Sequence, residues 1–203
     1  MSRTAHTAQS PMGLRERKKL KTRIAIRRAA HRLIAEQGYE ATSVEQIAEA
    51  AEVSPSTVSR YFPAKEDIVL GDGVDPVLEA GLRARPAGED PLDSMRYVLT
   101  GALAGLLDGE RAAAVQRTRL MVEVPAVRAR LDESLARTAE LLVPVLADRA
   151  GRPRDDLGVR VFTAAVLGAL REVLLHWAAR GHRDDPVELL DRALRAMKDG
   201  VRL

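Results

Sequence analysis

Cysteine is missing from all 203 residues, and aromatic residues make up only 3% of the chain. Without cysteine there is no disulfide, no thiolate metal ligand and no cysteine nucleophile, which fits a reducing compartment. The scarcity of aromatics, beside abundant alanine, leucine, valine and arginine, favours helices over sheets, and no run of alternating β-branched residues indicates a strand. A hydrophobic content of 46% with 30% charged residues is normal for a globular protein. We therefore expect an all-α globular fold.

Long apolar runs are also lacking. The longest uncharged stretches, such as residues 97–107, are too short to cross a bilayer. The first ten residues have no apolar segment of the kind found in signal peptides. These absences predict a soluble, cytoplasmic protein without a membrane partner.

Catalytic and metal-binding patterns are absent as well. The sequence has no glycine-rich phosphate loop and no serine, histidine and aspartate in a recognisable catalytic setting. The histidines share no metal-ligand spacing, and none is followed by an acid four residues later. They are His6, His31, His176 and His182. The sequence thus predicts a protein that is not an enzyme and needs no metal or cofactor.

The net charge of +3 is distributed unevenly along the chain. Residues 1–32 hold ten lysines and arginines against one acid, Glu16, whereas residues 71–203 hold 20 basic and 21 acidic side chains. A basic end on a neutral body is typical of a nucleic-acid binder. A solvated basic arm without a partner is the alternative. A membrane-surface helix fits less well, because Ile26, Ala30 and Leu33 form a core stripe without bulky aromatics beside it.

Residues 42–70 carry the strongest local pattern. Thr42 and Glu45 have the T-x-x-E spacing of a capping box, and apolar residues follow at helical spacing. Ser54 followed by Pro55 is a second helix start, with a hydroxyl cap before proline at the first helical position. Two short helices joined by a tight turn predict a helix-turn-helix, whose second helix enters the major groove of DNA.

The second of these helices is about two turns long. Its apolar and aromatic residues face inward, whereas Ser56, Thr57, Ser59 and Arg60 face outward. Serine and threonine can bind a base edge or a phosphate, and arginine can bind guanine O6 and N7 together. Taken alone, this row could equally be a solvated polar surface.

The surrounding sequence favours DNA binding. The segments A-A-H-R-L-I-A-E-Q-G-Y-E, A-T-S-V-E-Q-I-A-E-A-A-E-V-S and R-Y-F-P-A-K-E-D-I-V resemble the DNA-binding domain of the TetR/AcrR family of transcriptional regulators over about residues 22–70. Three positions depart from the family pattern. Glu52 replaces the usual turn glycine, Ser56 a frequent glycine, and Ser59 a common tyrosine. If position 52 is left-handed, a side chain there costs about 1 kcal/mol.

The resemblance implies a homodimer with an effector cavity in its second domain, most simply a repressor. It implies that residues of the second short helix contact bases and phosphates while flanking residues hold the DNA backbone. The former set is Ser54, Ser56, Thr57, Ser59 and Arg60, and the latter set is Thr42, Tyr61 and Lys65. Lys65 could also be a plain surface lysine.

The chain is expected to comprise a disordered arm over residues 1–13, a helix-turn-helix DNA-binding domain over 14–70 and a helical ligand-binding and dimerisation domain over 71–203. Gly38 ends the first helix, which is expected from residue 14 to 37. Asp75, Asp90 and Asp185 each precede proline, which predicts three capped helix starts. The helix expected over residues 155–180 is apolar on more than one face, so we expect it to pack against a second copy of the protein.

Ligand pockets in helical bundles are mostly apolar with a few polar groups. Candidate lining residues are Met95, Leu99, Leu103, Met121, Leu141, Phe162, Val166 and Trp177, with Arg119 or His176 as polar groups. Simple core packing is the alternative for each of them. The effector itself is unknown, and a small apolar ligand suits such a cavity.

The sequence therefore predicts a homodimeric repressor that binds a DNA operator and is released by a small apolar ligand. The alternative is a helical ligand-binding or protein-interaction module that has lost operator recognition, which Glu52 and Ser59 would allow.

Overall fold

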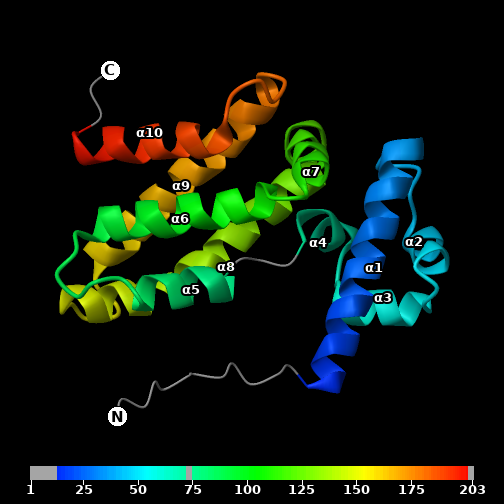
Figure 1. Ribbon diagram of the computed structural model, residues 1–203, viewed down its shortest axis with the longest axis horizontal. Coiled ribbons are helices and arrows are strands. Elements are labelled where there is room, and N and C mark those ends of the chain that lie inside the picture. Colours follow the sequence, from blue (N-terminus) through cyan, green and yellow to red (C-terminus); the bar gives the residue numbers. More distant parts are fainter. Residues whose placement is uncertain (1–12, 72–74, 201–203) are drawn as a thin grey trace, which may run out of the picture. The chain divides into compact units, whose positions relative to one another are not determined.

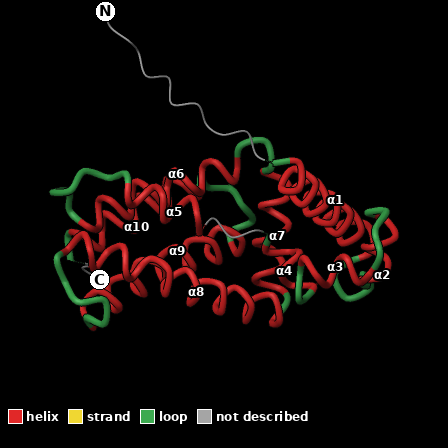
Figure 2. Tube along the Cα trace, turned by 90° about the horizontal axis from the view of Figure 1, so that it is seen from below, coloured by secondary structure: helices red, strands yellow, loops and turns green. Residues whose placement is uncertain are grey.

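The computed structural model describes residues 13–71 and 75–200, which form ten helices joined by loops, without a strand (Figures 1 and 2). The all-α prediction is confirmed. The chain divides into two compact units that meet between Ile68 and Val69. Of the predicted N-terminal arm, only Gly13 lies within the described residues.

The first unit contains α1 (Leu14–Gln37), α2 (Val44–Ala50), α3 (Pro55–Tyr61) and the beginning of α4 (Lys65–Leu70). The predicted limits of the first helix are confirmed, and Gly38 follows it with a φ of 89°. Side chains from all four helices form one buried apolar cluster: Ile26, Ala29, Ala30, Ile47, Ala48, Val58, Phe62 and Ile68. This small core fixes α3 against α1 and α2.

The start of α2 differs from the prediction by one residue. The capping box consists of Ser43 and Gln46, because the Ser43 hydroxyl accepts from the Gln46 amide and the Gln46 side chain accepts from the Ser43 amide. Thr42 is instead buried, and its hydroxyl donates to the Gly38 carbonyl oxygen at 2.8 Å. The sequence T-S-V-E-Q contains two possible capping boxes, Thr42 with Glu45 and Ser43 with Gln46. Because the Thr42 hydroxyl is bound to the Gly38 carbonyl, Ser43 caps α2.

The turn between α2 and α3 contains one residue with a left-handed backbone conformation. Glu52 has a φ of 55°, a region that side chains other than glycine rarely adopt. The next amide, of Val53, donates to the Ala48 carbonyl at 3.0 Å and closes the end of α2. Ser54 then caps α3 by accepting from the Thr57 amide at 3.2 Å, with Pro55 at the first helical position as predicted.

The second unit contains α5 (Asp75–Arg83), α6 (Pro91–Leu107), α7 (Arg111–Glu123), α8 (Pro125–Ala150), α9 (Leu157–Ala179) and α10 (Pro186–Lys198). Asp90 and Asp185 cap α6 and α10 through amides of the first turn, as predicted. Asp75 is already within α5, where its carboxylate accepts from the Thr138 hydroxyl at 2.7 Å. Gly151 ends α8 in the left-handed region.

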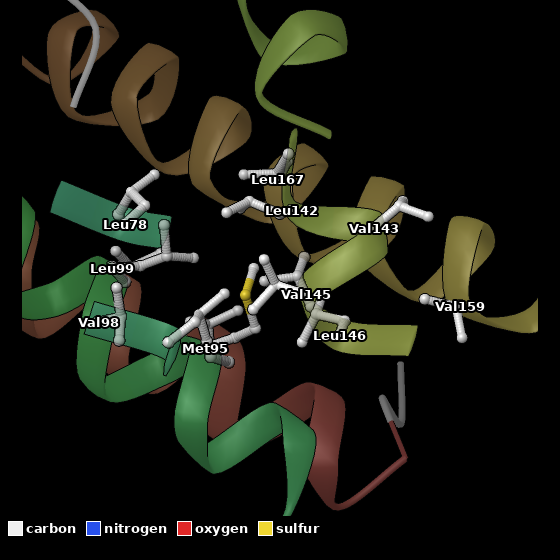
Figure 3. Close-up of a cluster of buried hydrophobic side chains, with 14 of the residues drawn as sticks. Leu78, Met95, Val98, Leu99, Leu142, Val143, Val145, Leu146, Val159 and Leu167 are labelled. Carbon is white, nitrogen blue, oxygen red and sulfur yellow. The ribbon is translucent and has the colours of Figure 1, made fainter. Parts of the chain in front are cut away.

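The core of the second unit lies between α5, α6, α8, α9 and α10. Helix α10 runs beside α6, although the two are far apart in the sequence (Figure 1). Figure 3 shows Leu78, Leu99 and Met95 directed toward side chains of α8 and α9 such as Leu142 and Leu167. A single apolar cluster therefore joins helices from both ends of this unit.

Candidate functional site

The outer face of α3 carries a chain of hydroxyl groups. The Ser54 hydroxyl lies 2.9 Å from those of both Ser56 and Thr57. The Ser59 hydroxyl donates to the Pro55 carbonyl at 3.2 Å. Ser54, Ser56 and Ser59 are exposed, and Thr57 is half-buried. The hydroxyls therefore face solvent while hydrogen bonds within the helix orient them.

Two arginines flank the end of α3. Arg60 is exposed, and its guanidinium carbon lies 5.5 Å from the centre of the Tyr61 ring. Arg23 of α1 lies 4.8 Å from the centre of the Phe62 ring and donates to the Tyr61 carbonyl at 3.5 Å. Burial, with the nearby Arg27, lowers the pKa of Arg23. Sequence reasoning counted Arg23 only as part of the basic segment, because nothing local indicates that it reaches α3.

Lys65 has a structural role in the described unit. Its ammonium donates to the carbonyl oxygens of Tyr39 and Thr42 at 2.9 and 3.0 Å and lies 3.9 Å from the centre of the Tyr39 ring. The Tyr39 hydroxyl donates to the Glu66 carboxylate. Burial of the Tyr39 side chain is the larger cause, and this hydrogen bond the second, that raises the pKa of Tyr39. Lys65 thus ties α4 to the loop before α2. With its hydroxyl engaged and its side chain buried, Thr42 has no exposed group to offer DNA.

The second unit contains a partly open cavity of about 150 Å³. Its wall is formed by α5 to α9 and by the last residue of α4. The lining residues are Leu70, Gly71, Leu78, Leu99, Ala102, Leu103, Leu106, Leu107, Ala114, Arg117, Thr118, Met121, Leu131, Ser134, Leu170, Leu174 and Trp177. The wall is therefore mainly leucine, with three polar side chains.

Leu99, Leu103, Met121 and Trp177, expected to line a pocket, do line this cavity. Four other expected residues do not. Met95 and Val166 are at most 1% exposed within the apolar core, where Leu141 and Phe162 also pack. Figure 3 shows Met95 beside Val145 and Leu146. Helical spacing identifies the inward side of a helix, but both cavity and core lie on that side.

The polar groups of the cavity also differ from those expected. Arg119 and His176 are exposed, and Arg119 pairs with Glu123 at 2.7 Å. The polar lining residues are instead Arg117, Thr118 and Ser134. Arg117 is only 8% exposed. An arginine two residues from Arg119 points inward because successive helical residues are turned by about 100°.

Thr118 and Trp177 are held by a residue outside the wall. The Thr118 hydroxyl donates to the Ala114 carbonyl at 2.8 Å and lies 2.8 Å from His182 Nε2. The His182 ring meets Trp177 edge-on at 4.5 Å, and the indole nitrogen donates to the Asp184 carbonyl at 2.8 Å. Burial, and then the charge of Arg111, lower the His182 pKa, so the neutral ring is favoured.

Within residues 13–71 and 75–200, no three His, Asp or Glu side chains gather where they could hold a metal ion. Over the same ranges, every helix is too short or too polar to span a bilayer.

Two family models match the chain. Residues 26–71 match the model of bacterial regulatory proteins of the tetR family, and residues 89–202 match the MftR C-terminal domain. The first match contains α2, α3 and α4. The second contains α6 to α10, which supply most of the cavity wall.

Individual proteins give the same result over nearly the whole length. The chain is 37% identical to the HTH-type transcriptional regulator TcmR of Streptomyces glaucescens, over 98% of this chain and 90% of that protein. Thermus thermophilus FadR, a TetR-family transcriptional repressor solved with lauroyl-CoA, is 26% identical with a TM-score of 0.58, over 89% of this chain and 95% of that one. FadR of Bacillus subtilis, solved with stearoyl-CoA, has a TM-score of 0.61 at 24% identity, covering 88% and 99% of the two chains, which supports the fold alone.

These matches agree with the helix-turn-helix geometry of the first unit and the helical second unit. The chain belongs to the TetR family of DNA-binding transcriptional regulators.

Proposed function

We propose that this regulator is a homodimeric repressor that binds a specific operator through α3 and leaves it when a small ligand occupies the cavity. The observation that carries the proposal is the exposed, internally oriented row of hydroxyls on α3 with Arg60 at its end. A helix that presents such groups after a tight turn is suited to the major groove.

Ser56, Thr57, Ser59 and Arg60 contact base edges and phosphates in this proposal. Ser54 is nearest the helix start, where its hydroxyl and the amides of the first turn suit a phosphate. Tyr61 holds the DNA backbone. Lys65 acts mainly by fixing the loop before α2, because its ammonium already binds two carbonyl oxygens. Thr42 takes no direct part.

The dimer forms through α9. Leu157 and Val161 are 73% and 58% exposed, and Ala164, Ala165 and Gly168 continue the same side of the helix at helical spacing. Exposed apolar surface of this extent on a helix favours association with a second copy. Two heads related by a twofold axis would read a pseudo-palindromic operator with half-sites about one helical turn apart or somewhat more.

Effector binding would act through α4. The last residue of α4, Leu70, lines the cavity, whereas Lys65 at its first turn holds the loop of the first unit. A ligand that moves Leu70 therefore pulls on the element that supports α2. Such a ligand weakens DNA binding only if it binds the DNA-incompetent arrangement more tightly. The complex of Thermus thermophilus FadR with lauroyl-CoA supports an effector that has an apolar part.

Selection of genomic fragments by the purified protein tests operator recognition. We expect near-physiological salt to yield a few fragments that share a pseudo-palindrome. In a parallel selection, the Arg60→Ala variant should recover fragments that share the same pseudo-palindrome but no longer share one particular base in each half-site. If no sequence is enriched and binding disappears as salt rises, the protein is a helical ligand-binding or interaction module that has lost operator recognition.

A further inference from the structure

The three polar side chains of the cavity wall differ in what they already bind. Arg117 has an interaction partner of its own. The Thr118 hydroxyl donates to the Ala114 carbonyl at 2.8 Å and lies 2.8 Å from His182 Nε2. Ser134 is half-buried on α8, and no hydrogen bond joins its hydroxyl to another described residue. The Ser134 hydroxyl is therefore the polar group of the described wall that can bind a ligand without losing a partner in the protein.

The surroundings of this hydroxyl determine which ligands suit it. Most of the lining residues are apolar, and none of those described is acidic. A wholly apolar ligand that fills the cavity would take the Ser134 hydroxyl out of water without giving it a partner, which costs free energy. An ionised ligand would lose its hydration against a mainly apolar wall whose one described charged side chain is already engaged. A neutral ligand with one hydroxyl group avoids both costs.

We infer that the cavity binds a small neutral alcohol or phenol, whose apolar body contacts the leucines and whose hydroxyl binds Ser134. The inference rests on the proposed ligand-controlled function and specifies the ligand's class. A serine hydroxyl both donates and accepts hydrogen bonds, so it can pair with another hydroxyl in either direction.

The size of the cavity limits the apolar body of the ligand. A volume of about 150 Å³ equals that of an engineered apolar cavity that holds benzene. A single ring or a short chain therefore fits. Trp177, the only tryptophan of the chain, lines the cavity and is 1% exposed, so its fluorescence can report the ligand.

The test compares benzyl alcohol with ethylbenzene, which has nearly the same size but carries a methyl group in place of the hydroxyl. Each is titrated into the free full-length protein while Trp177 fluorescence and the midpoint of thermal unfolding are recorded. Benzoate and benzylammonium, measured at the same ionic strength, test the charge of the ligand. We expect both ions to bind more weakly than benzyl alcohol.

Ser134→Ala removes the hydroxyl and should fold, because alanine has the higher helix propensity. We expect this variant to bind benzyl alcohol about fivefold more weakly, which corresponds to the roughly 1 kcal/mol of a typical hydrogen bond. Ethylbenzene should bind it at least as tightly as it binds the unchanged protein.

Thr100→Val is the matched control, because it also removes one hydroxyl without a change of shape. Thr100 lies on α6 between two lining residues, Leu99 and Ala102, but does not line the cavity itself. Its hydroxyl donates to the Arg96 carbonyl of the same helix at 2.7 Å. We expect Thr100→Val to bind both neutral probes as the unchanged protein does.

The possible failures of this inference and of the proposed function can be told apart. If Ser134→Ala changes the affinities for benzyl alcohol and ethylbenzene equally, or changes neither, the role of Ser134 is overturned and an apolar effector remains. Tighter binding of benzoate or benzylammonium than of benzyl alcohol would overturn the neutral class.

The operator supplies the other comparison. If the probes bind with the expected preference but leave operator affinity unchanged, the ligand class stands and the ligand control in the proposed function fails. If no probe changes the fluorescence or the unfolding midpoint although the protein still selects its operator, both fail.

Discussion

The candidate functional groups are exposed in the first unit of this protein and buried in the second. In the first unit, the hydroxyls of α3 and Arg60 lie on the surface, above a small apolar core. In the second unit, the cavity is lined mainly by leucines, and the one charged side chain among its described lining residues is buried. The surface site comes from seven consecutive residues of one helix, whereas the cavity wall comes from residues between 70 and 177. Residues of the surface site can therefore be substituted without altering the fold, whereas substitutions in the cavity wall also alter the packing of the helices around it.

Half-buried cations extend the comparison. Lys65 in the first unit and Arg149 in the second both bind backbone carbonyls in loops or at the end of a helix. Arg149 donates to the carbonyls of Leu82, Arg85 and Pro86 at 2.8–3.1 Å, and to the Ser94 hydroxyl at 3.2 Å. Arg117 differs from both, because it faces a cavity. Substitutions of Lys65 and Arg149 test how much these contacts to backbone carbonyls contribute.

The largest effect is expected from Arg149→Met. The substitution removes the hydrogen bonds of the guanidinium to the carbonyl of Leu82, in the last turn of α5, and to those of Arg85 and Pro86 in the loop that follows. We therefore expect the free energy of unfolding to fall by about 3 kcal/mol. Denaturant unfolding measures the loss, and Arg152→Met, at a side chain that is 65% exposed, is the control. Equal stability of the two variants would show that the Arg149 contacts add nothing to the second unit.

Arg60→Ala should weaken operator binding by about 1–3 kcal/mol at one base position and relax specificity there. The side chain is exposed, so the free energy of unfolding should change little. Competition binding against operators that differ at single positions measures the effect. A loss of the same size at every position would mean that Arg60 contacts phosphate and reads no base.

Lys65→Met tests whether this lysine positions a loop or contacts a phosphate. Because its ammonium holds the Tyr39 and Thr42 carbonyls, we expect a loss of about 1–2 kcal/mol in stability and weaker operator binding with an unchanged salt dependence. A phosphate contact would instead lower the slope of log affinity against log salt by about 1. Lys21→Met, at an exposed position of α1, is the matched variant.

The smallest effect is expected from Glu52→Gly. Glycine relieves the left-handed φ of 55° but gains freedom in the unfolded chain, so the net stabilisation should be about 0.5–1 kcal/mol. Glu49→Gly, within α2, should destabilise by a similar amount. The midpoint of thermal unfolding compares them, and a destabilised Glu52→Gly would contradict the strain at this turn.

The sequence predicts the helices well where local chemistry sets their ends. Gly38, Asp90 and Asp185 each act within one turn, so their positions predict helix limits without knowledge of the packing. Overlapping local signals were less reliable: Thr42 and Ser43 compete for one cap, and a hydrogen bond to Gly38 decides between them. The family resemblance supplied the division into a DNA-binding domain and a ligand-binding domain, which stays a prediction.

The sites differ in the same way. The row on α3 is visible in the sequence because its spacing is local, although the hydrogen bonds of Lys65 to the loop before α2 are not. The cavity could be predicted only in part. Leu99 and Trp177 line it, but Met95 and Val166 belong to the core, and Arg117 replaces Arg119 as the polar group. Which inward residue meets empty space depends on how five helices pack together.

The linkage between the two units is measured most directly with a selected operator and a small apolar probe, such as benzyl alcohol, that binds the free protein. Probe affinity is determined with and without operator, and operator affinity with and without probe. The account predicts that each ligand weakens the other by the same factor, because coupling free energy is reciprocal. Unchanged affinities in both directions, with the probe bound, would contradict control of α3 from the cavity.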